Sequence, residues 1–423
     1  MLDPDELHVW HRDQLVGFLW RDADDRIGFR YDADWVRNGF RLSVQLPLTT
    51  AAFEPGDPRA PFFFRNLLPE GEARSRLLSL RRLPDSDFVL LREYGGDCAG
   101  AISILPGDMD PTSTARYAAL SEEMLHQLVQ DRGASAYAPT DRSPAVRLSL
   151  AGAQHKCPVF HEGGTYALPQ GVAPSSHVLK FEVSDLRNVP LYECFLGRLA
   201  RAAGLEVCES TIDQVRELRF LRITRYDRVR NSQELQRLHQ EDFLQALGPT
   251  YRDKYESLGG PGARACAELI RTHCEDPVTD LQRLVQWQAF NVLAGNSDGH
   301  AKNLSLLQTG IEQDAWRLAP FYDLLCTRAF PRLDAALALS VGGEFTPGDV
   351  TPTHWARFAR DCGFAGAGAR RIVEDIRSLA ERLPTLLDAT RAAFEAEFGT
   401  APALQQVEEV VRQQCRRHLA LGD

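Results

Sequence analysis

The chain is organised around Asn296-Ser297-Asp298-Gly299-His300-Ala301-Lys302-Asn303 and the later segment Leu318-Ala319-Pro320-Phe321-Tyr322-Asp323. The residues at 281–293 form an apolar run with helical periodicity, and Gly295 is a suitable left-handed cap for that helix. The polar stretch at 296–303 is therefore predicted to be a loop fixed to a packed helix. Such loops commonly carry catalytic groups.

Two short strands are predicted after this loop, at 304–307 and 316–319, with a polar turn between them. A hairpin brings its outer ends together. Asp298 and Asn303, which precede the hairpin, are therefore expected to lie close to Asp323, which follows it.

These three side chains are the groups that phosphoryl transfer requires. One carboxylate accepts the proton of the attacking hydroxyl, while an amide oxygen and a second carboxylate hold Mg²⁺ on the nucleotide phosphates. We assign Asp298 as the base and Asn303 and Asp323 as the metal ligands. The alternative is a polar loop whose Asp and Asn side chains cap turns, which would explain a single Asp-Gly pair better than the whole set.

Composition indicates a globular protein of the cytosol. A chain of 423 residues is expected to form two or three subdomains, and the net charge of −10 argues against a generally basic DNA-coating surface. No apolar run has the length of a transmembrane helix, and the acidic start at 1–6 lacks the features of a signal peptide. The nine cysteines form no C-x-x-C pair, so we expect reduced thiols rather than a zinc site.

The first hundred residues are predicted to form a small mixed subdomain. We expect strands at 15–20, 27–31, 41–44 and 62–64, and a helix at 88–93 that is capped by Asp85 or Ser86. This region carries no chemical motif of its own, so we interpret it as structural or partner-binding. Further along, an apolar strand is predicted at 337–341 and helices at 351–363, 368–383 and 402–421.

A second informative stretch lies at 147–156, where the small residues Ala151-Gly152-Ala153 follow a predicted strand. Backbone N–H groups in such a loop can hold a phosphate. The stretch matches neither the Walker loop nor G-x-G-x-x-G, so an ordinary hairpin loop is the simpler interpretation. Lys180 follows Val178 and Leu179 in a predicted strand. It either meets a phosphate or is an edge-strand lysine that extends to solvent.

These motifs resemble those of the HipA-type serine/threonine kinases, the toxin half of bacterial toxin–antitoxin pairs. The matching segments are Asn-Ser-Asp-Gly-His-Ala-Lys-Asn at 296–303, Leu-Ala-Pro-Phe-Tyr-Asp-Leu at 318–324, Ser-Leu-Ala-Gly-Ala-Gln-His-Lys at 149–156, Gln-Glu-Asp at 240–242 and Gly-Gly-Pro-Gly at 259–262. The resemblance extends over nearly the whole chain. One departure is Cys157, at a position where the family often has a hydroxyl residue.

The resemblance implies an α+β, two-lobed, protein-kinase-like (HipA-like) fold. Residues 1–105 would form an N-terminal subdomain, 106–235 the β-rich small lobe, and 236–423 the mainly helical large lobe.

The resemblance also implies roles for individual residues. It places the phosphate loop at Ala151, Gly152, Ala153, Gln154, His155 and Lys156, and the phosphate-binding lysine at Lys180. It places the adenine hinge near Thr224 and Tyr226, although Tyr226 is equally well explained as a core tyrosine, and the autophosphorylated serine at Ser149. We further hypothesise that Lys302 stabilises the transferred phosphoryl group and that His300 orients the loop.

The implied function is that of an ATP- and Mg²⁺-dependent serine/threonine protein kinase that arrests growth. The implied partners are a small HipB-like helix-turn-helix antitoxin, operator DNA reached mainly through that antitoxin, and a protein substrate, which in some family members is an aminoacyl-tRNA synthetase. Two alternatives remain: a small-molecule phosphotransferase of similar fold, and an inactive corepressor bound to the antitoxin. The intact Asp298, Asn303, Asp323 and Lys180 argue against the corepressor.

Overall fold

The computed structural model describes residues 6–137, 147, 154–231, 234–251, 253–310 and 315–421. The chain forms two compact units. The first unit comprises Met1–Val183, Asp213–Glu241 and Leu307–Asp314, and the second comprises Ser184–Ile212, Asp242–Leu306 and Ala315–Asp423. The three-part division expected at residues 105 and 235 stays a prediction.

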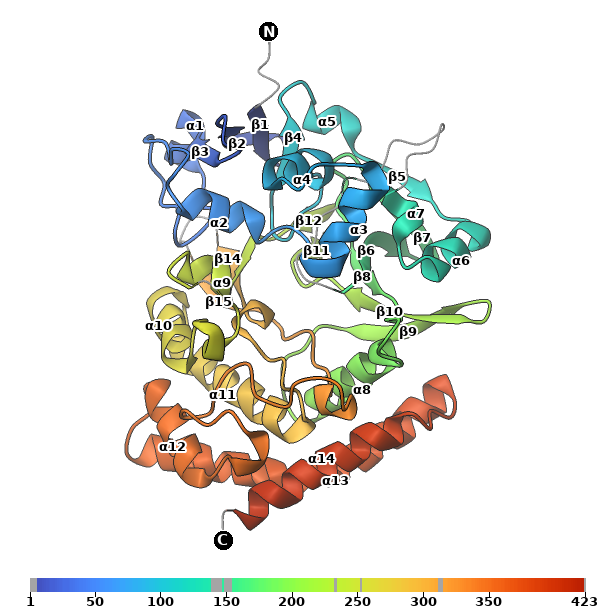
Figure 1. Cartoon of the computed structure of the whole chain (residues 1–423), viewed down its shortest axis with the longest axis vertical. Helices are drawn as coiled ribbons and strands as arrows, with labels where there is room; N and C mark the ends of the chain where they lie inside the picture. The colour runs from blue at the N-terminus through green and yellow to red at the C-terminus, as the bar shows by residue number, and fades with distance from the viewer. Residues whose placement is uncertain are drawn as a thin grey trace. The chain divides into compact units, whose positions relative to one another are not determined.

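The first unit begins with an antiparallel four-stranded sheet in the order β3-β2-β1-β4 (Figure 1). Its strands are β1 (Glu6–His11), β2 (Gln14–Arg21), β3 (Ile27–Tyr31) and β4 (Ser103–Pro106). The strands predicted at 15–20 and 27–31 are confirmed as β2 and β3. Leu7 and Val9 of β1 point into the core on alternate positions, as a half-buried strand requires.

Short helices accompany this sheet: α1 (Ala33–Asn38), α2 (Arg59–Arg65), α3 (Gly71–Arg81) and α4 (Asp87–Tyr94). Helix α2 packs on β3, and α4 packs on β4. The helix predicted at 88–93 is confirmed as α4. Its N-cap is Ser86, whose hydroxyl accepts a hydrogen bond from the Val89 N–H at 3.2 Å.

Two strands predicted in this region are wrong. The run Phe62–Phe64 lies in helix α2, where Phe63 and Phe64 are buried. Three consecutive apolar residues have no periodicity, so they do not distinguish a buried strand from a buried helix. The segment at 41–44 has no strand, although an isolated bridge joins Ser43 to Leu46.

A second, six-stranded sheet of the first unit has the order β5-β7-β6-β8-β10-β9. Its strands are β5 (Arg116–Ala119), β6 (Lys156–Glu162), β7 (Thr165–Gln170), β8 (His177–Lys180), β9 (Ser210–Val215) and β10 (Leu218–Thr224). Helix α6 (Glu122–Gln130) packs on β10, and the buried Leu128 and Val129 face the core. The sheet is followed by the hairpin of β11 (Arg228–Arg230) and β12 (Leu235–Arg237). The unit also has α5 (Pro111–Thr114) and α7 (Ala134–Tyr137).

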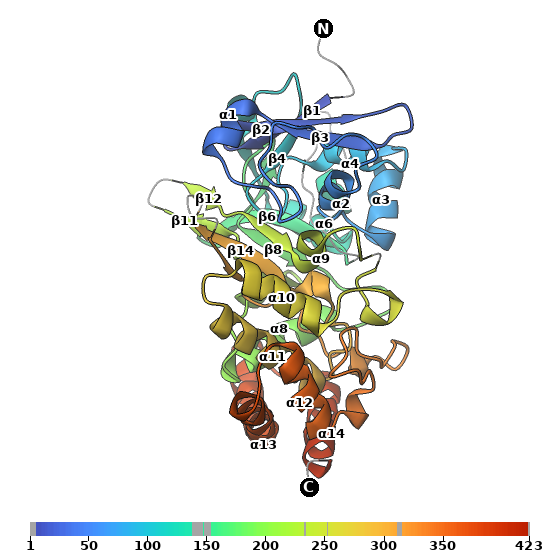
Figure 2. The same ribbon diagram turned by 90° about the vertical axis from the view of Figure 1, so that its left-hand side faces the viewer.

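The second unit is mainly helical. Its helices are α8 (Val189–Ala202), α9 (Phe243–Leu247), α10 (Ala263–His273), α11 (Pro277–Ala294), α12 (Pro352–Asp361), α13 (Ala367–Phe398) and α14 (Leu404–Ala420). Helix α11 contacts α10, α13 and α14, and it buries residues around its circumference, which makes it the centre of this unit. Figure 2 shows α13 and α14, which pack against each other. The chain passes from the first unit to the second within β13 (Gln240–Asp242), and it returns to the first unit within β14 (Ser305–Gly310). Strand β15 (Ala315–Leu318) lies in the second unit.

The predicted helices of the second unit are confirmed, with one difference in length. Helix α13 continues through Pro384 to Phe398, beyond the predicted end at 383. The strand predicted at 337–341 is wrong: the segment is buried but irregular, with a single bridge between Val341 and Glu344. Among the described residues, no helix combines the length and apolar character needed to cross a membrane.

Candidate functional site

The loop Asn296–Asn303, called the polar loop below, is attached to the end of α11. Gly295 adopts the predicted left-handed conformation (φ 73°), and its N–H bonds to carbonyls of the last helical turn. The Asn296 N–H donates to the Asn291 carbonyl at 2.8 Å, and the Asn296 amide donates to the Asn291 side-chain oxygen at 3.0 Å. The Asn296 side-chain oxygen then accepts from the Asp298 N–H at 3.2 Å. These bonds fix the backbone that carries Asp298.

The polar loop is also held from the side. The Ser297 N–H donates to Thr327 Oγ1 at 2.7 Å, and the Ser297 hydroxyl donates to the Ala335 carbonyl at 2.9 Å. Gly299 lies against α11: a Cβ at this position would be 2.6 Å from Asn291 Nδ2. A side chain at 299 would therefore push the loop away from the helix.

Asp298 is the most exposed residue of the polar loop, in which Lys302 is partly exposed and the others are buried. About half of its side chain reaches solvent (51%), and Oδ1 accepts a hydrogen bond from the Tyr255 hydroxyl at 2.8 Å. Desolvation by the surrounding protein raises the pKa of Asp298, and the Asp323 charge raises it further. The Tyr255 hydrogen bond and the Lys254 charge oppose this shift in the pKa. A raised carboxyl pKa gives a stronger base, which suits the predicted role.

His300 is buried beside Asp298, with Nε2 at 4.0 Å from Asp298 Oδ1. Its ring meets the Tyr255 ring edge to face, at a centroid distance of 5.5 Å. Burial, reinforced by the Lys254 charge, lowers the pKa of His300 to about 3, so the imidazole is neutral at physiological pH. Its buried Nδ1 has no hydrogen-bond partner among the described residues. The hypothesis that His300 orients the loop stays a prediction.

The hairpin brings its two ends together as expected. The Ala319 N–H donates to the Ser305 carbonyl at 2.8 Å, and the Tyr322 hydroxyl donates to the Lys302 carbonyl at 3.0 Å. Asp323 directly follows Tyr322 and has a positive φ of 54°. Such a backbone conformation is strained for a residue with a side chain, and it is frequent at functional sites.

Asn303 completes this group from the last turn of the polar loop. It lies in the short 3-10 helix η2 (Ala301–Asn303), and its side chain is almost fully buried (5% exposed). Its side-chain oxygen has no hydrogen-bond partner among the described residues. Because an unsatisfied buried amide oxygen is destabilising, an oxygen kept in this state is suited to a ligand such as a metal ion.

The first unit holds the predicted phosphate-binding lysines. Lys180 lies in β8, which has β6 on one side and β10 on the other, and it is buried (5% exposed). The alternative of an edge-strand lysine that extends to solvent is therefore wrong. Lys156 of β6 is the direct cross-strand partner of Lys180, so the two side chains share one face of the sheet.

Only some of the other predicted site residues of the first unit lie among the residues that the structure describes. Ser149, Ala151, Gly152 and Ala153 lie outside the described residues. Gln154 and His155 lead into β6, and His155 Nε2 is 3.6 Å from Glu72 Oε1. Thr224 ends β10, and the half-buried Tyr226 donates a hydrogen bond to the Gln240 side chain. The hinge role of Thr224 and Tyr226 stays a prediction.

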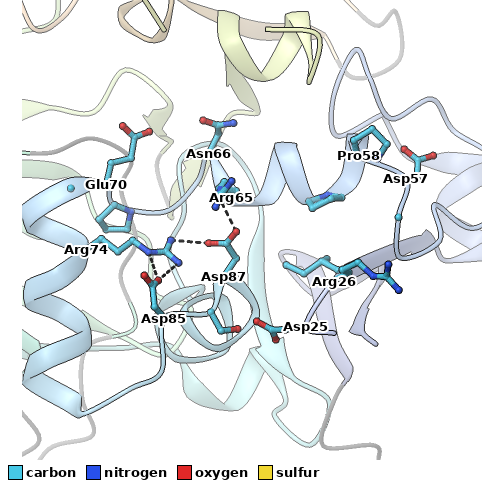
Figure 3. A pocket seen from close by; sticks show the side chains of 16 residues that line it. Asp25, Arg26, Asp57, Pro58, Arg65, Asn66, Glu70, Arg74, Asp85 and Asp87 are labelled. Atoms are coloured by element: carbon cyan, nitrogen blue, oxygen red, sulfur yellow. Dashed lines mark hydrogen bonds and ion pairs between the residues drawn. The ribbon is translucent and has the colours of Figure 1, made fainter. Parts of the chain in front are cut away.

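A separate hollow of about 580 Å³ lies in the first unit, beside α2, α3 and the start of α4 (Figure 3). Its charged side chains bond to one another: Arg74 is 2.7 Å from Asp85 and 2.8 Å from Asp87, and Arg65 is 3.2 Å from Asp87. None of the predicted site residues lines this hollow. Its paired charges give no sign of a reacting group, so we keep two candidate groups, the lysine pair in the first unit and the polar loop in the second.

Tyr255 is the residue near Asp298 that the sequence analysis missed. It is 43 positions away from Asp298 and belongs to no recognisable motif. Tyr255 directly precedes the short 3-10 helix η1 (Glu256–Leu258), and its position next to Asp298 depends on how that helix packs. The Ser340 N–H fixes the start of η1 by donating to Glu256 Oε2 at 2.6 Å. Sequence periodicity carries no signal for such a contact.

The fold and these residues define a protein of the kinase-like class, with an α+β, two-lobed, HipA-like fold. Comparison with known families shows that residues 7–105 match the HipA N-terminal domain and residues 148–383 match the HipA-like C-terminal domain. The chain belongs to the HipA family.

Individual relatives agree with this assignment. The serine/threonine-protein kinase toxin HipA of Shewanella oneidensis is 31% identical over an alignment 421 positions long, which covers 93% of this chain and 93% of the relative. Protein Y4mE of Sinorhizobium fredii, provisionally named as a kinase, is 35% identical over 397 residues, 91% and 92% of the two chains. The solved complex of Shewanella oneidensis HipA with HipB and operator DNA matches with a TM-score of 0.82 at 26% identity, covering 98% of both chains.

Proposed function

We propose that this chain is an ATP- and Mg²⁺-dependent serine/threonine protein kinase that acts as a growth-arresting toxin. The observation that carries the proposal is the polar loop, where Asn303 keeps a buried side-chain oxygen without a partner among the described residues. The rigid attachment of this loop holds Asp298, the proposed base, in the same short segment. Similarity to the HipA kinase toxin supports the activity.

The donor set fits Mg²⁺. Asn303 and Asp323 offer an amide oxygen and a carboxylate, which are the hard ligands that this ion prefers, and it usually takes few ligands from protein. When bound, Mg²⁺ neutralises the charge that builds up on the phosphates during transfer. The unusual backbone of Asp323 is consistent with a carboxylate that must be presented in one direction.

The reaction follows from the remaining side chains. Asp298 accepts the proton of a serine or threonine hydroxyl while the hydroxyl oxygen forms a bond to the γ-phosphorus of ATP. The bond between that phosphorus and the β,γ-bridging oxygen breaks, and ADP leaves. Lys180, Lys156 and the loop at 151–156 bind the phosphates, and Lys302 stabilises the transferred phosphoryl group. The neutral His300 packs against Tyr255 and keeps the loop in place.

The proposed biological setting is a toxin–antitoxin pair of the cytoplasm. The similarity to a HipA solved with HipB and operator DNA supports a HipB-like helix-turn-helix antitoxin as the partner. The net charge of −10 favours DNA contact through that partner rather than directly. The substrate would be a protein, for which an aminoacyl-tRNA synthetase is the first candidate, and Ser149 would be the site of autophosphorylation.

The test is labelling of the purified protein with γ-labelled ATP and Mg²⁺, with EDTA as the metal-free control. Asp298→Asn keeps an acceptor for the Tyr255 hydroxyl and removes the base, so we expect labelling to fall by about 10²- to 10⁴-fold. Ser149→Ala should lose label on the protein itself and keep activity on an added substrate.

Three outcomes separate the alternatives. Loss of label in both variants supports a kinase that modifies its own loop. Wild-type labelling by Asp298→Asn would mean that the base is assigned wrongly. ATP binding without any labelled protein would favour the small-molecule phosphotransferase or the corepressor.

A further inference from the structure

Asp97 follows α4 in the N-terminal segment, and its carboxylate is completely buried (0% exposed). Oδ1 accepts from Arg228 at 2.8 Å and from Arg237 at 2.8 and 3.0 Å, and Oδ2 accepts from Arg225 at 3.1 Å. The buried Asp227 accepts in turn from Arg225 and Arg228, each at 2.8 Å. We call these five residues the Asp97 cluster.

Asp97 is also bonded to the segment that leads into the lysine strand. Oδ2 accepts from the Ser175 N–H at 3.0 Å and from the Ser175 hydroxyl at 2.6 Å. The next residue, Ser176, donates its N–H to the Val159 carbonyl of β6 at 2.9 Å. Strand β8, which ends in Lys180, begins directly afterwards.

The backbone of Asp97 makes a third connection. Its N–H donates to the Arg147 carbonyl at 3.0 Å, and Arg147 lies four positions before Ala151, where the predicted phosphate loop begins. The chains approach so closely here that a Cβ on Gly96 would lie 2.8 Å from the Arg147 carbonyl oxygen and 2.2 Å from the Gly171 carbonyl oxygen. Only glycine at 96 permits this approach.

These three connections lead to the three segments of the first unit that the sequence assigns to the nucleotide. Arg225 lies between the predicted hinge residues Thr224 and Tyr226, Ser175 precedes the strand of Lys180, and Arg147 precedes the phosphate loop. A residue bonded to these segments fixes their mutual spacing, and a misplacement of about 1 Å is enough to impair a site.

We propose that Asp97 is the positioning residue of the nucleotide-binding half of the site, so that the N-terminal segment sets the affinity for ATP. This inference rests on the proposed kinase function, and it assigns the segment a role beyond structure or partner binding. The neighbouring arginines hold the pKa of Asp97 well below its usual range against the effect of burial, so the carboxylate stays ionised at physiological pH.

Two substitutions test the proposal by different routes. Ser175→Ala removes the hydroxyl bond to Asp97 and the bond that this hydroxyl accepts from Arg225 at 2.9 Å, and it leaves the backbone bond to Asp97 in place. Asp97→Asn weakens all of the charged contacts of the carboxylate. The matched control is Asp87→Asn, because Asp87 also joins two arginines of the first unit (Figure 3). Within the described structure, Asp87 makes no bond to Ser175 or Arg147.

The measurements are the dissociation constant of Mg²⁺-ATP by direct titration, the KM for ATP and kcat, each next to a thermal unfolding curve. We expect Ser175→Ala to raise the dissociation constant and the KM at least about tenfold, because its hydroxyl bonds to two charged groups, Asp97 and Arg225, with kcat nearly unchanged. Asp97→Asn should raise both further, and the two changes should be non-additive because they disrupt one hydrogen-bond network. Asp87→Asn should change stability alone.

The outcomes are separable. Equal KM values for Ser175→Ala and Asp87→Asn would overturn the positioning role, and so would additive effects of Asp97→Asn and Ser175→Ala. If Asp97→Asn does not fold, Gly96→Ala takes its place, and a wild-type affinity for ATP in that variant would again overturn the proposal. Failure of the wild-type protein to bind ATP at all would refute the proposed function itself.

Discussion

The Asp97 cluster and the polar loop are both buried and polar, and they differ in how their acceptor atoms are satisfied; in the cluster, the buried atom without a partner among the described residues is a donor, Arg228 Nε. In the Asp97 cluster, both oxygens of Asp97 and both oxygens of Asp227 accept bonds from arginine side chains. In the polar loop, Asn303 Oδ1 and His300 Nδ1 are buried without a partner among the described residues. The two groups lie in different units of one chain.

This difference offers a way to distinguish buried polar groups that hold the structure together from those that are suited to binding a ligand. A buried ion pair that loses one partner is destabilised by about 3–5 kcal/mol, so the Asp97 cluster holds its surroundings in one arrangement. An unsatisfied oxygen lowers stability by about 1–3 kcal/mol, and it persists where a ligand bond offsets that loss. The comparison predicts that removing a satisfied buried polar group lowers the free energy of unfolding, and that removing an unsatisfied one does not lower it.

The largest effect is expected for Asn303→Leu. If Asn303 holds Mg²⁺ as proposed, its replacement should lower kcat/KM at least about a hundredfold, because a metal ion contributes several kcal/mol to charge stabilisation. The free energy of unfolding should stay the same or rise, because the substitution removes an unsatisfied buried oxygen. Phosphoryl-transfer kinetics and denaturant unfolding of the metal-free protein measure the two quantities.

Asn296→Leu is the matched control in the same loop. Asn296 bonds to the Asn291 side chain and to the Asp298 N–H, so this variant should lose about 1–3 kcal/mol of stability. If Asn303→Leu were as destabilised as Asn296→Leu, the oxygen of Asn303 would have a structural partner, and the contrast between the two environments would fail.

A smaller effect is expected for Gly299→Ala. The new methyl group would meet Asn291 Nδ2 at 2.6 Å, so we expect a loss of about 1–3 kcal/mol in the free energy of unfolding and a lower kcat, because Asp298 moves with the loop. Gly197→Ala is the control: it lies inside α8 with its nearest neighbour at 3.6 Å, and it should stabilise the protein by roughly 0.5–1 kcal/mol. Equal free energies of unfolding for Gly299→Ala and Gly197→Ala would show that the polar loop shifts to accommodate the new methyl group at no cost.

Much of the polar loop and its surroundings could be predicted from sequence, because the relevant groups are close together along the chain. The helix end at Gly295 and the hairpin between Asn303 and Asp323 depend on local rules of capping and alternation. The backbone strain at Asp323 could not be predicted, since no rule of local propensity places a carboxylate in the left-handed region there.

The Asp97 cluster could not be predicted for the opposite reason. The bonds between Asp97 and its arginines join residues that are more than a hundred positions apart, and each residue taken alone is an ordinary charged residue. The error at Phe62–Phe64 has a related origin, because a short apolar run signals burial without signalling its secondary structure. Sequence therefore predicted the local placement of the polar loop more readily than the long-range contacts of the Asp97 cluster.

The smallest effect expected is a shift in the pH profile of Tyr255→Phe. The Tyr255 hydroxyl lowers the pKa of Asp298, so its removal should raise that pKa further. Because the base must be ionised to accept a proton, activity is lost as the pH falls through its pKa. The acid limb of kcat/KM should therefore move to higher pH, with little change on the alkaline side of the limb.

His300 does not contribute to this limb, because its pKa of about 3 keeps it neutral throughout the working range. Tyr117→Phe is a suitable control, since it removes a hydroxyl that bonds to the Pro174 carbonyl in the first unit. An acid limb that stays at the same pH in Tyr255→Phe would mean that the ionisation belongs to a group other than Asp298. A shift of the acid limb in Tyr255→Phe alone would tie the pH dependence to the polar loop. The group that titrates during turnover would then be the exposed carboxylate of Asp298 rather than a charge of the Asp97 cluster.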